Sequence, residues 1–195
     1  MDNYKTIANK ISEGYYTEKR SKFLAFAHHV ESAAEAMEVV KGYRKKYYDA
    51  RHCCYAYMIG PERQEFRAND DGEPSSTAGK PILGQINSNE LTNILIVVVR
   101  YYGGVNLGTG GLIVAYRTAA ADAISNSEIV ERLVEEQITY DFTYPMMNAV
   151  MRVVKEMPVR IVSQHFDNSC TITLAIKKSM AEQLRERLKK LDFEG

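Results

Sequence analysis

The chain has 195 residues, of which 45% are hydrophobic and 26% charged, and its 25 Lys and Arg balance its 25 Asp and Glu. This composition is typical of a globular protein that buries a core, and it excludes a polycation that binds nucleic acid by bulk charge. The odd number of cysteines argues against a disulfide framework, and no apolar run reaches the roughly 18 residues that span a bilayer. We therefore expect a cytoplasmic protein that makes no membrane contact.

The first part of the chain predicts two strands and a helix. The strands cover residues 4–11 and 15–30 and are joined near Gly14. The second strand contains a basic element, which either binds phosphate or forms a solvated strand end. The cations of this element are Lys19, Arg20 and Lys22. Ser32 and Glu35 then form a capping box, which predicts the start of a helix.

A third strand is predicted over residues 51–59. His52 and Cys54 share one face of this strand, because side chains alternate along a strand. The two residues are metal ligands, a thiol–imidazole pair or packed side chains. The chain offers no second Cys/His pair with the spacing of a zinc site, and cysteine is among the most commonly buried residues. We favour packing and keep His52 as a candidate binding residue.

A polar loop over residues 69–81, the acidic loop, carries three carboxylates, three hydroxyls and a lysine. Its candidate binding residues are Asp70, Asp71, Glu73, Thr77 and Lys80. The spacing of the acids does not match an EF-hand, and the Gly-Lys pair does not complete a P-loop. The loop is either a turn at Asp71-Gly72 before a helix that a hydroxyl of residues 75–77 caps, or the lining of a binding site.

The apolar run over residues 94–99 predicts a central strand, because an edge strand would alternate with polar residues. Arg100, Tyr101 and Tyr102 follow where this strand leaves the core. A glycine-rich connection then leads into a helix over residues 112–123. The glycines of the connection are Gly103, Gly104, Gly108, Gly110 and Gly111. Such a connection either serves the geometry of a tight turn or directs free N–H groups at an anion.

The break in the pattern at residues 125–127 predicts a boundary between a domain over residues 1–127 and a second domain over residues 128–195. The second domain is expected to contain a strand, a helix, two strands and a helix, in that order. This is one strand short of a ferredoxin-like unit, and no final strand is evident. Both domains mix helices with strands, which assigns the chain to the α+β class.

Three long motifs follow one another along the first domain. They are His52-Cys-Cys-Tyr-Ala-Tyr57, Asn69-Asp-Asp-Gly-Glu-Pro-Ser-Ser-Thr-Ala-Gly79 and Arg100-Tyr-Tyr-Gly-Gly-Val-Asn-Leu-Gly-Thr-Gly-Gly-Leu112. With these motifs the chain resembles the two-domain bacterial members of the IMPACT/YigZ family, although Ser76 stands where the family commonly has glycine. The resemblance implies an N-terminal sheet of the ribosomal-protein and GHMP-kinase type with helices on one face, and a ferredoxin-like C-terminal domain. It also implies a link to translation, because the eukaryotic relatives look like translation regulators.

The leading hypothesis is a regulatory protein without enzymatic activity that contacts RNA, the ribosome or a translation factor. Tyr101 or Tyr102 would stack on an unpaired base. The expected basic surface consists of Lys19, Arg20, Lys22, Arg44, Lys45, Arg51 and Arg100. The alternative is a phosphate- or nucleotide-binding enzyme, in which the glycine-rich connection holds an anion and the acidic loop binds a divalent cation. We assign no catalytic residue, no metal site and no cofactor.

The acidic loop and the glycine-rich connection are predicted to form a single site. Arg100 ends the central strand, and the acidic loop precedes the helix that leads back into that strand. Short connections keep successive elements adjacent, so both loops are expected at the same end of the sheet. A carboxylate of the acidic loop is then expected to pair with Arg100, either as a structural pair or as part of a ligand contact.

Overall fold

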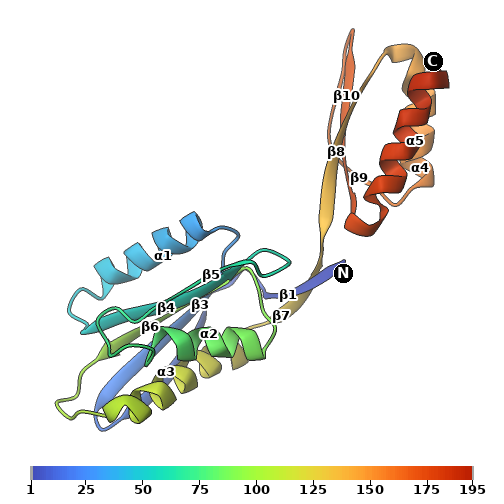
Figure 1. The fold of residues 1–195 in the computed structure, drawn as a ribbon. Coiled ribbons are helices and arrows are strands. Elements are labelled where there is room, and N and C mark those ends of the chain that lie inside the picture. The colour runs from blue at the N-terminus through green and yellow to red at the C-terminus, as the bar shows by residue number, and fades with distance from the viewer. Residues whose placement is uncertain (1, 195) are drawn as a thin grey trace. The chain divides into compact units, whose positions relative to one another are not determined.

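The structure is a computed structural model that describes residues 2–194 and consists of two compact units (Figure 1). The first unit covers Tyr4–Arg132, and the second covers the chain from Leu133 onward together with Asp2 and Asn3. Both units combine helices with strands, so the predicted α+β class is confirmed.

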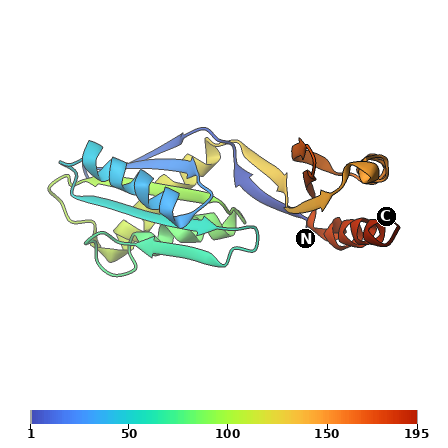
Figure 2. The same cartoon turned by 90° about the horizontal axis from the view of Figure 1, so that it is seen from above.

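The last strand of the first unit follows the predicted junction at residue 127. This strand, β7 (Ile129–Leu133), pairs with the first strand of the chain, β1 (Asn3–Ile7), in a two-stranded sheet (Figure 2). The N–H of Ala8 donates to the carbonyl oxygen of Glu128 at 2.8 Å and extends this pairing. The division between the two compact units falls between Arg132 and Leu133, at the last residue of β7, and the predicted domain boundary at residue 127 stays a prediction.

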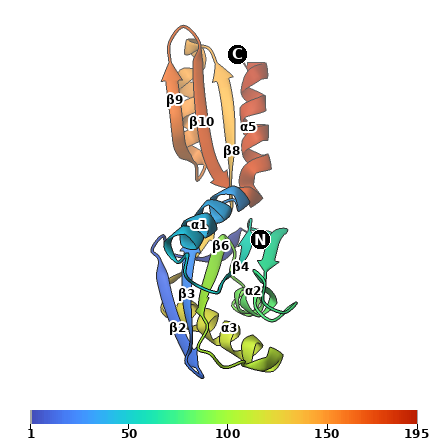
Figure 3. The ribbon, with the colours of Figure 1, turned by 90° about the vertical axis from the view of Figure 1, so that its left-hand side faces the viewer.

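A five-stranded antiparallel sheet forms the centre of the first unit (Figure 3). Its strands stand in the order β2-β3-β6-β4-β5. In that order they cover Ser12–Glu18, Ser21–His29, Ile94–Tyr101, His52–Ile59 and Glu65–Asn69. β6 is the middle strand, and residues 94–100 are all buried. The prediction of a central strand over residues 94–99 is therefore confirmed.

Helices cover both faces of this sheet. α1 (Ala33–Lys46) packs on the face that carries residues 95, 97 and 99 of β6. α2 (Gly79–Ser88) and α3 (Gly108–Ser125) pack on the opposite face, over residues 94, 96 and 98 (Figure 1). The expectation of helices on one face only is wrong, because β6 and β4 are apolar at consecutive positions and so have two faces to bury.

The predicted strand over residues 15–30 is in fact part of a hairpin. β2 and β3 are joined by a turn at Lys19 and Arg20, whose φ angles are +47° and +68°. The basic element is thus a turn, although neither residue type favours a left-handed backbone. Gly14 lies inside β2 rather than between two strands. A side chain at this glycine would meet the backbone nitrogen of Ala123 in α3 at 2.3 Å.

The second unit is a three-stranded antiparallel sheet with two helices on one face. Its strands stand in the order β8-β10-β9 and cover Glu135–Phe142, Cys170–Lys177 and Arg160–Phe166. Its helices are α4 (Met147–Glu156) and α5 (Ala181–Glu194), each preceded by a short 3-10 turn, η1 (Tyr144–Met146) and η2 (Lys178–Met180). The predicted order of a strand, a helix, two strands and a helix is confirmed, and the ferredoxin-like description stays a prediction. None of the helices described within residues 2–194 has the length and apolar character that crossing a bilayer requires.

Candidate functional site

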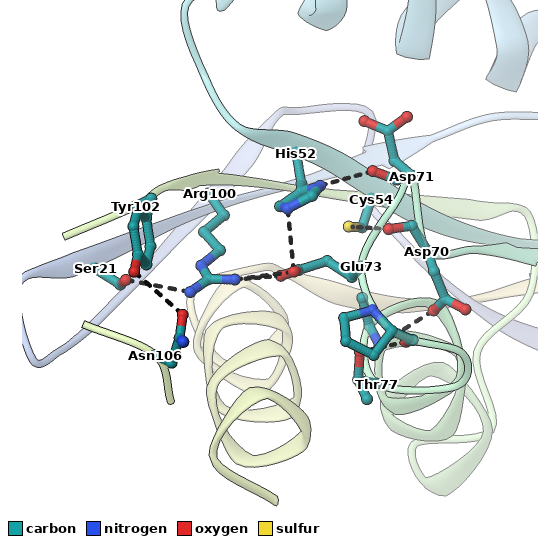
Figure 4. Close-up of polar contacts among 12 residues, drawn as sticks. Ser21, His52, Cys54, Asp70, Asp71, Glu73, Thr77, Arg100, Tyr102 and Asn106 are labelled. Carbon is teal, nitrogen blue, oxygen red and sulfur yellow. Dashed lines mark hydrogen bonds and ion pairs between the residues drawn. The ribbon is translucent and has the colours of Figure 1, made fainter. Parts of the chain in front are cut away.

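Arg100 and Glu73 form a buried ion pair at the end of the central strand (Figure 4). One guanidinium nitrogen of Arg100, Nη1, donates to both carboxylate oxygens of Glu73, at 2.9 and 2.8 Å. Only 5% of Arg100 and 7% of Glu73 are exposed. The prediction that Arg100 pairs with a carboxylate of the acidic loop is confirmed, and Glu73 is the partner.

The Glu73 carboxylate has two further partners. The hydroxyl of Tyr116, from α3, donates to it at 2.6 Å, and Nε2 of His52, from β4, lies 3.1 Å from it. Nδ1 of His52 lies 2.7 Å from the carbonyl oxygen of Asp71, so both ring nitrogens face oxygen acceptors. One carboxylate thereby fastens the acidic loop to β4, β6 and α3.

Cys54 lies in the core beside this cluster. Its thiol donates to the carbonyl oxygen of Asp70 at 3.1 Å and lies 3.4 Å from the hydroxyl of Tyr116. Burial raises the pKa of Cys54 well above its usual range and the pKa of Cys53 to about 11, so both thiols are protonated at neutral pH. Burial also raises the pKa of Tyr116, which keeps its hydroxyl a donor to Glu73. The packing interpretation of Cys54 is confirmed.

The other two carboxylates of the acidic loop hold backbone groups. Asp70 accepts hydrogen bonds at 2.9, 3.2 and 2.8 Å from the N–H groups of Ser76, Ala78 and Gly79. Asp71 accepts the N–H of Cys53 at 2.7 Å. The expectation that a hydroxyl of residues 75–77 caps α2 is wrong, because Asp70 takes the N–H groups at the start of that helix. Both carboxylates are thus engaged in fixing the shape of the loop.

Three glycines of the connection after β6 are required by its geometry. A side chain at Gly103 would meet the backbone carbonyl carbon of Arg20 at 2.2 Å, because the connection passes close to the β2–β3 turn. Gly104 and Gly108 have positive φ angles of 89° and 71°. By contrast, nothing lies within 4 Å of the position that a side chain at Gly110 would occupy. The tight-turn interpretation therefore explains Gly103, Gly104 and Gly108, but it does not explain Gly110 in the first turn of α3.

Replacing Gly103 with alanine is expected to lower the free energy of unfolding by about 1–3 kcal/mol, because the β2–β3 turn must move to admit the added carbon. Gly110→Ala is the matched control. Its added carbon meets open space and alanine favours a helix, so its stability should stay within about 1 kcal/mol of the wild type. Urea unfolding measures both variants, and equal stabilities would contradict the close approach at Gly103.

A cavity of about 340 Å³ is bordered by Arg100 and by the start of α3. Its other polar lining residues are Arg51, His52, Glu73, Tyr102, Asn106 and Thr109. Figure 4 shows the Arg100 side chain between Glu73 and Tyr102, and the hydroxyl of Tyr102 donates to Asn106 at 3.1 Å. The guanidinium groups of Arg51 and Arg100 lie 4.8 and 5.5 Å from the centre of the Tyr102 ring. The cavity is thus lined by two guanidinium groups and one carboxylate, which suits it to an anion.

A second depression, the aromatic groove, lies on the sheet face that carries α1. It has a volume of about 600 Å³ and is lined by Tyr15, Arg20, Lys22, Leu24, Tyr47, Tyr101 and Tyr102. Tyr102 borders both the groove and the cavity, so the two depressions are neighbours. The rings of Tyr15 and Tyr102 are accessible, with exposed fractions of 49% and 37%.

The predicted binding residues divide into three groups. The cavity holds His52, Glu73, Arg100, Tyr102 and Gly108. The aromatic groove holds Arg20, Lys22, Tyr101 and, again, Tyr102. Neither depression is lined by Lys19, Asp70, Asp71, Thr77, Lys80, Gly103, Gly104, Gly110 or Gly111.

Sequence reasoning missed two residues of the aromatic groove and one that contacts Glu73. Tyr47 continues the buried stripe of α1, which hid its place in the aromatic groove. Tyr15 carries no signal beyond its place on a strand. Tyr116 had a signal, because it is the only aromatic side chain in the Ala-rich sequence of α3, and a large residue there must reach a specific neighbour.

The sequence and the fold both match known proteins. The Impact N-terminal domain model matches residues 19–124. An IMPACT family member of Haemophilus influenzae is 32% identical over 172 residues, which cover 87% of this chain and 84% of that protein. The IMPACT family member YigZ of Escherichia coli is 29% identical with the same coverage of 87% and 84%. A crystal structure of a hypothetical protein has a TM-score of 0.75 and 28% identity, and the match covers 99% of this chain and 93% of that chain.

The matched residues contain the structural parts from which the site is built. Residues 19–124 include β4, the acidic loop, β6, the glycine-rich connection and nearly all of α3. The three sequence motifs therefore belong to one domain, and their side chains meet around Glu73. From this family model and these relatives we conclude that the chain belongs to the IMPACT family.

Proposed function

We propose that the protein is a translation-linked regulatory protein that binds single-stranded RNA in the aromatic groove. The link to translation rests on the family, since the resemblance of its motifs implies translation regulation. The choice of RNA over a ribosomal or factor surface rests on the groove, where accessible tyrosine rings lie beside two cations. Basic grooves with aromatic rings are the common means of holding an unpaired nucleic-acid strand.

The cations of the groove are available to a phosphate backbone. Arg20 and Lys22 are exposed, and within residues 2–194 neither forms an ion pair. Both stand at the β2–β3 hairpin, next to the ring of Tyr15. A strand that stacks its bases on the tyrosines would therefore bring its phosphates toward these cations.

Tyr101 serves as a fixed wall of the groove. Its hydroxyl donates to Asp49 at 2.8 Å, which holds the ring in place. Burial, and after it the bond to Asp49, raises the pKa of Tyr101 to about 12, so the phenol stays neutral beside an RNA phosphate.

Tyr15→Ala is expected to weaken binding of a single-stranded oligoribonucleotide by about 5- to 150-fold, which corresponds to the roughly 1–3 kcal/mol of one stacked base. Tyr144→Ala is the matched control, because this tyrosine is 67% exposed and lies in the second unit. Fluorescence anisotropy measures the affinities, and thermal unfolding verifies that both variants fold. A folded Tyr15→Ala variant with wild-type affinity would contradict the groove as the RNA site.

Salt supplies an independent measure of the same contact. Phosphate contacts release counterions, so the affinity of the wild type should fall as salt rises from about 50 to 200 mM, with a slope of about 0.7 per contact for a single strand. Removal of Arg20 and Lys22 together should lower that slope. An affinity that does not change with salt would show that the cations do not contact phosphates.

The link to translation is tested with ribosomes. We expect the intact protein to sediment with ribosomes at low salt, and we expect Tyr15→Ala to reduce the bound fraction. Sedimentation that Tyr15→Ala leaves unchanged would point to a protein surface of the ribosome instead of its RNA. No association at any salt would argue against the ribosome as partner.

A phosphate- or nucleotide-binding enzyme is the second candidate function. The observation that favours it is the cavity at the start of α3, which two guanidinium groups and one carboxylate line. The metal-dependent form has less support, because Asp70 and Asp71 accept backbone N–H groups. Nucleotide hydrolysis in the presence of Mg²⁺ tests this candidate directly, and its absence with ATP and GTP would argue against it.

A further inference from the structure

The N-terminus of α3, which no side chain caps, borders the cavity. α3 begins at Gly108, its N-cap residue Leu107 offers no side-chain hydrogen bond, and its first turn contains no acidic residue. The first N–H groups of a helix have no partner within the helix, and the helix dipole favours an anion there. Gly108 and Thr109, the first two residues of the helix, both line the cavity.

Arg100 is an independent sign that the cavity holds an acceptor. Within residues 2–194, its Nε is the one buried side-chain nitrogen or oxygen that has no hydrogen-bond partner. The other two nitrogens are engaged, Nη1 with Glu73 and Nη2 with the hydroxyl of Ser21 at 3.5 Å. The side chain is 6% exposed, and an unmade hydrogen bond at a buried charged group is costly. Arg100 also borders the cavity, so a buried guanidinium with an unmade hydrogen bond stands at its edge.

The charge of the cavity selects an anion. Arg51 and Arg100 carry two positive charges over the same ring, that of Tyr102. Glu73 supplies one negative charge, and its oxygens already accept from Arg100 and Tyr116 and lie 3.1 Å from Nε2 of His52. Within residues 2–194, Arg51 forms no ion pair. The exposed guanidinium of Arg51 is therefore the free charge of the cavity.

We infer that this cavity binds the terminal phosphomonoester of the RNA strand that occupies the aromatic groove, an inference that rests on the proposed function. A terminal phosphate carries up to two negative charges and three free oxygens, which match the helix N–H groups and the guanidinium groups better than a bridging phosphodiester does. Tyr102 borders both depressions, so a strand lying in the groove ends at the cavity. The volume of about 340 Å³ is large enough for a phosphate with its sugar.

The test compares three oligoribonucleotides of one sequence, with a 5′-phosphate, a 3′-phosphate or hydroxyl groups at both ends. The wild type is expected to bind one of the phosphorylated strands at least about tenfold more tightly than the hydroxyl strand, because charge-assisted hydrogen bonds are added. Arg51→Ala should reduce this ratio to less than about threefold. This exposed residue can be removed without opening the core, and Arg117→Ala, an exposed arginine on α3, should keep the ratio.

The outcomes separate the inference from the proposed function. Equal affinities for all three strands would overturn the terminal phosphate site while leaving RNA binding in the groove intact. Binding of none of the three would overturn both. A preference for a phosphorylated end that Arg51→Ala does not change would also overturn this assignment, because the preference would then arise at another place. Thermal shifts with 5′-AMP and adenosine supply a second readout, and only 5′-AMP is expected to stabilise the wild type.

Discussion

Arg100→Ala is expected to lower the free energy of unfolding by about 3–5 kcal/mol, because it leaves the Glu73 charge buried without its cationic partner. The side chain of Glu73 is 3% exposed, so its charge depends on the guanidinium for compensation. His52 and Tyr116 keep their contacts with Glu73 but cannot fill the space that Arg100 occupied. Urea unfolding measures the change, and the slope of the transition shows whether the variant still unfolds in one step.

Two further variants decide how this loss is interpreted. Arg67→Ala removes an exposed arginine of β5 and should change stability by no more than about 0.5 kcal/mol. Arg100→Met combined with Glu73→Leu removes both charges and should be more stable than Arg100→Ala alone. A loss below about 1 kcal/mol for Arg100→Ala would contradict a structural role, and would favour Arg100 as a ligand contact only.

Phe23→Ala is the second large effect, with an expected loss of about 3–5 kcal/mol. Phe23 is fully buried in β3 and packs its ring 5.1 Å from the ring of Tyr116, edge to face. The guanidinium of Arg100 lies 5.6 Å from the centre of the Phe23 ring. Removal of the Phe23 ring therefore creates a core cavity. It also removes a packing contact of Tyr116 and of Arg100, which both bind Glu73.

Phe66→Ala is the control for the chemistry of the substitution. Phe66 is 59% exposed on β5, so the loss of its ring should cost less than about 1 kcal/mol. Thermal and urea unfolding of the two variants measure the contrast. A Phe23→Ala variant as stable as Phe66→Ala would mean that the core around Phe23 closes over the lost ring without cost.

Connectivity alone was enough to predict that a carboxylate of the acidic loop pairs with Arg100. The acidic loop and Arg100 are joined by α2 and β6, and short connections left few other places for the loop. The choice among the three carboxylates was not predictable. Asp71 has a φ angle of +41° and Gly72 one of +86°, and these left-handed residues set the direction in which each side chain points. Such a bend depends on contacts with β4 that no local pattern records.

The faces of the sheet show a similar limit. The apolar run of β6 indicated burial on both sides, yet the sequence does not say which helix covers which side. The β2–β3 turn was hidden for another reason. Lys19 and Arg20 adopt a backbone that Gly or Asn usually provides, so the hairpin looked like one long strand. The aromatic groove could not be predicted for a different reason. It brings together residues from β2, β3, the end of α1 and β6, which are far apart in the sequence.

The pairing of β1 with β7 has a consequence for the order in which the chain folds. Strands β2 to β6 all lie within residues 12–101, so the five-stranded sheet has all its strands early in synthesis. The first strand of the chain contacts Leu91 and Thr92 through Lys5, but it pairs with β7 only when residues 129–133 have left the ribosome. Contacts between such distant residues form late, because a long loop must close before they are made. The pairing of β1 with β7 is thus expected to be among the last contacts of the first unit to form.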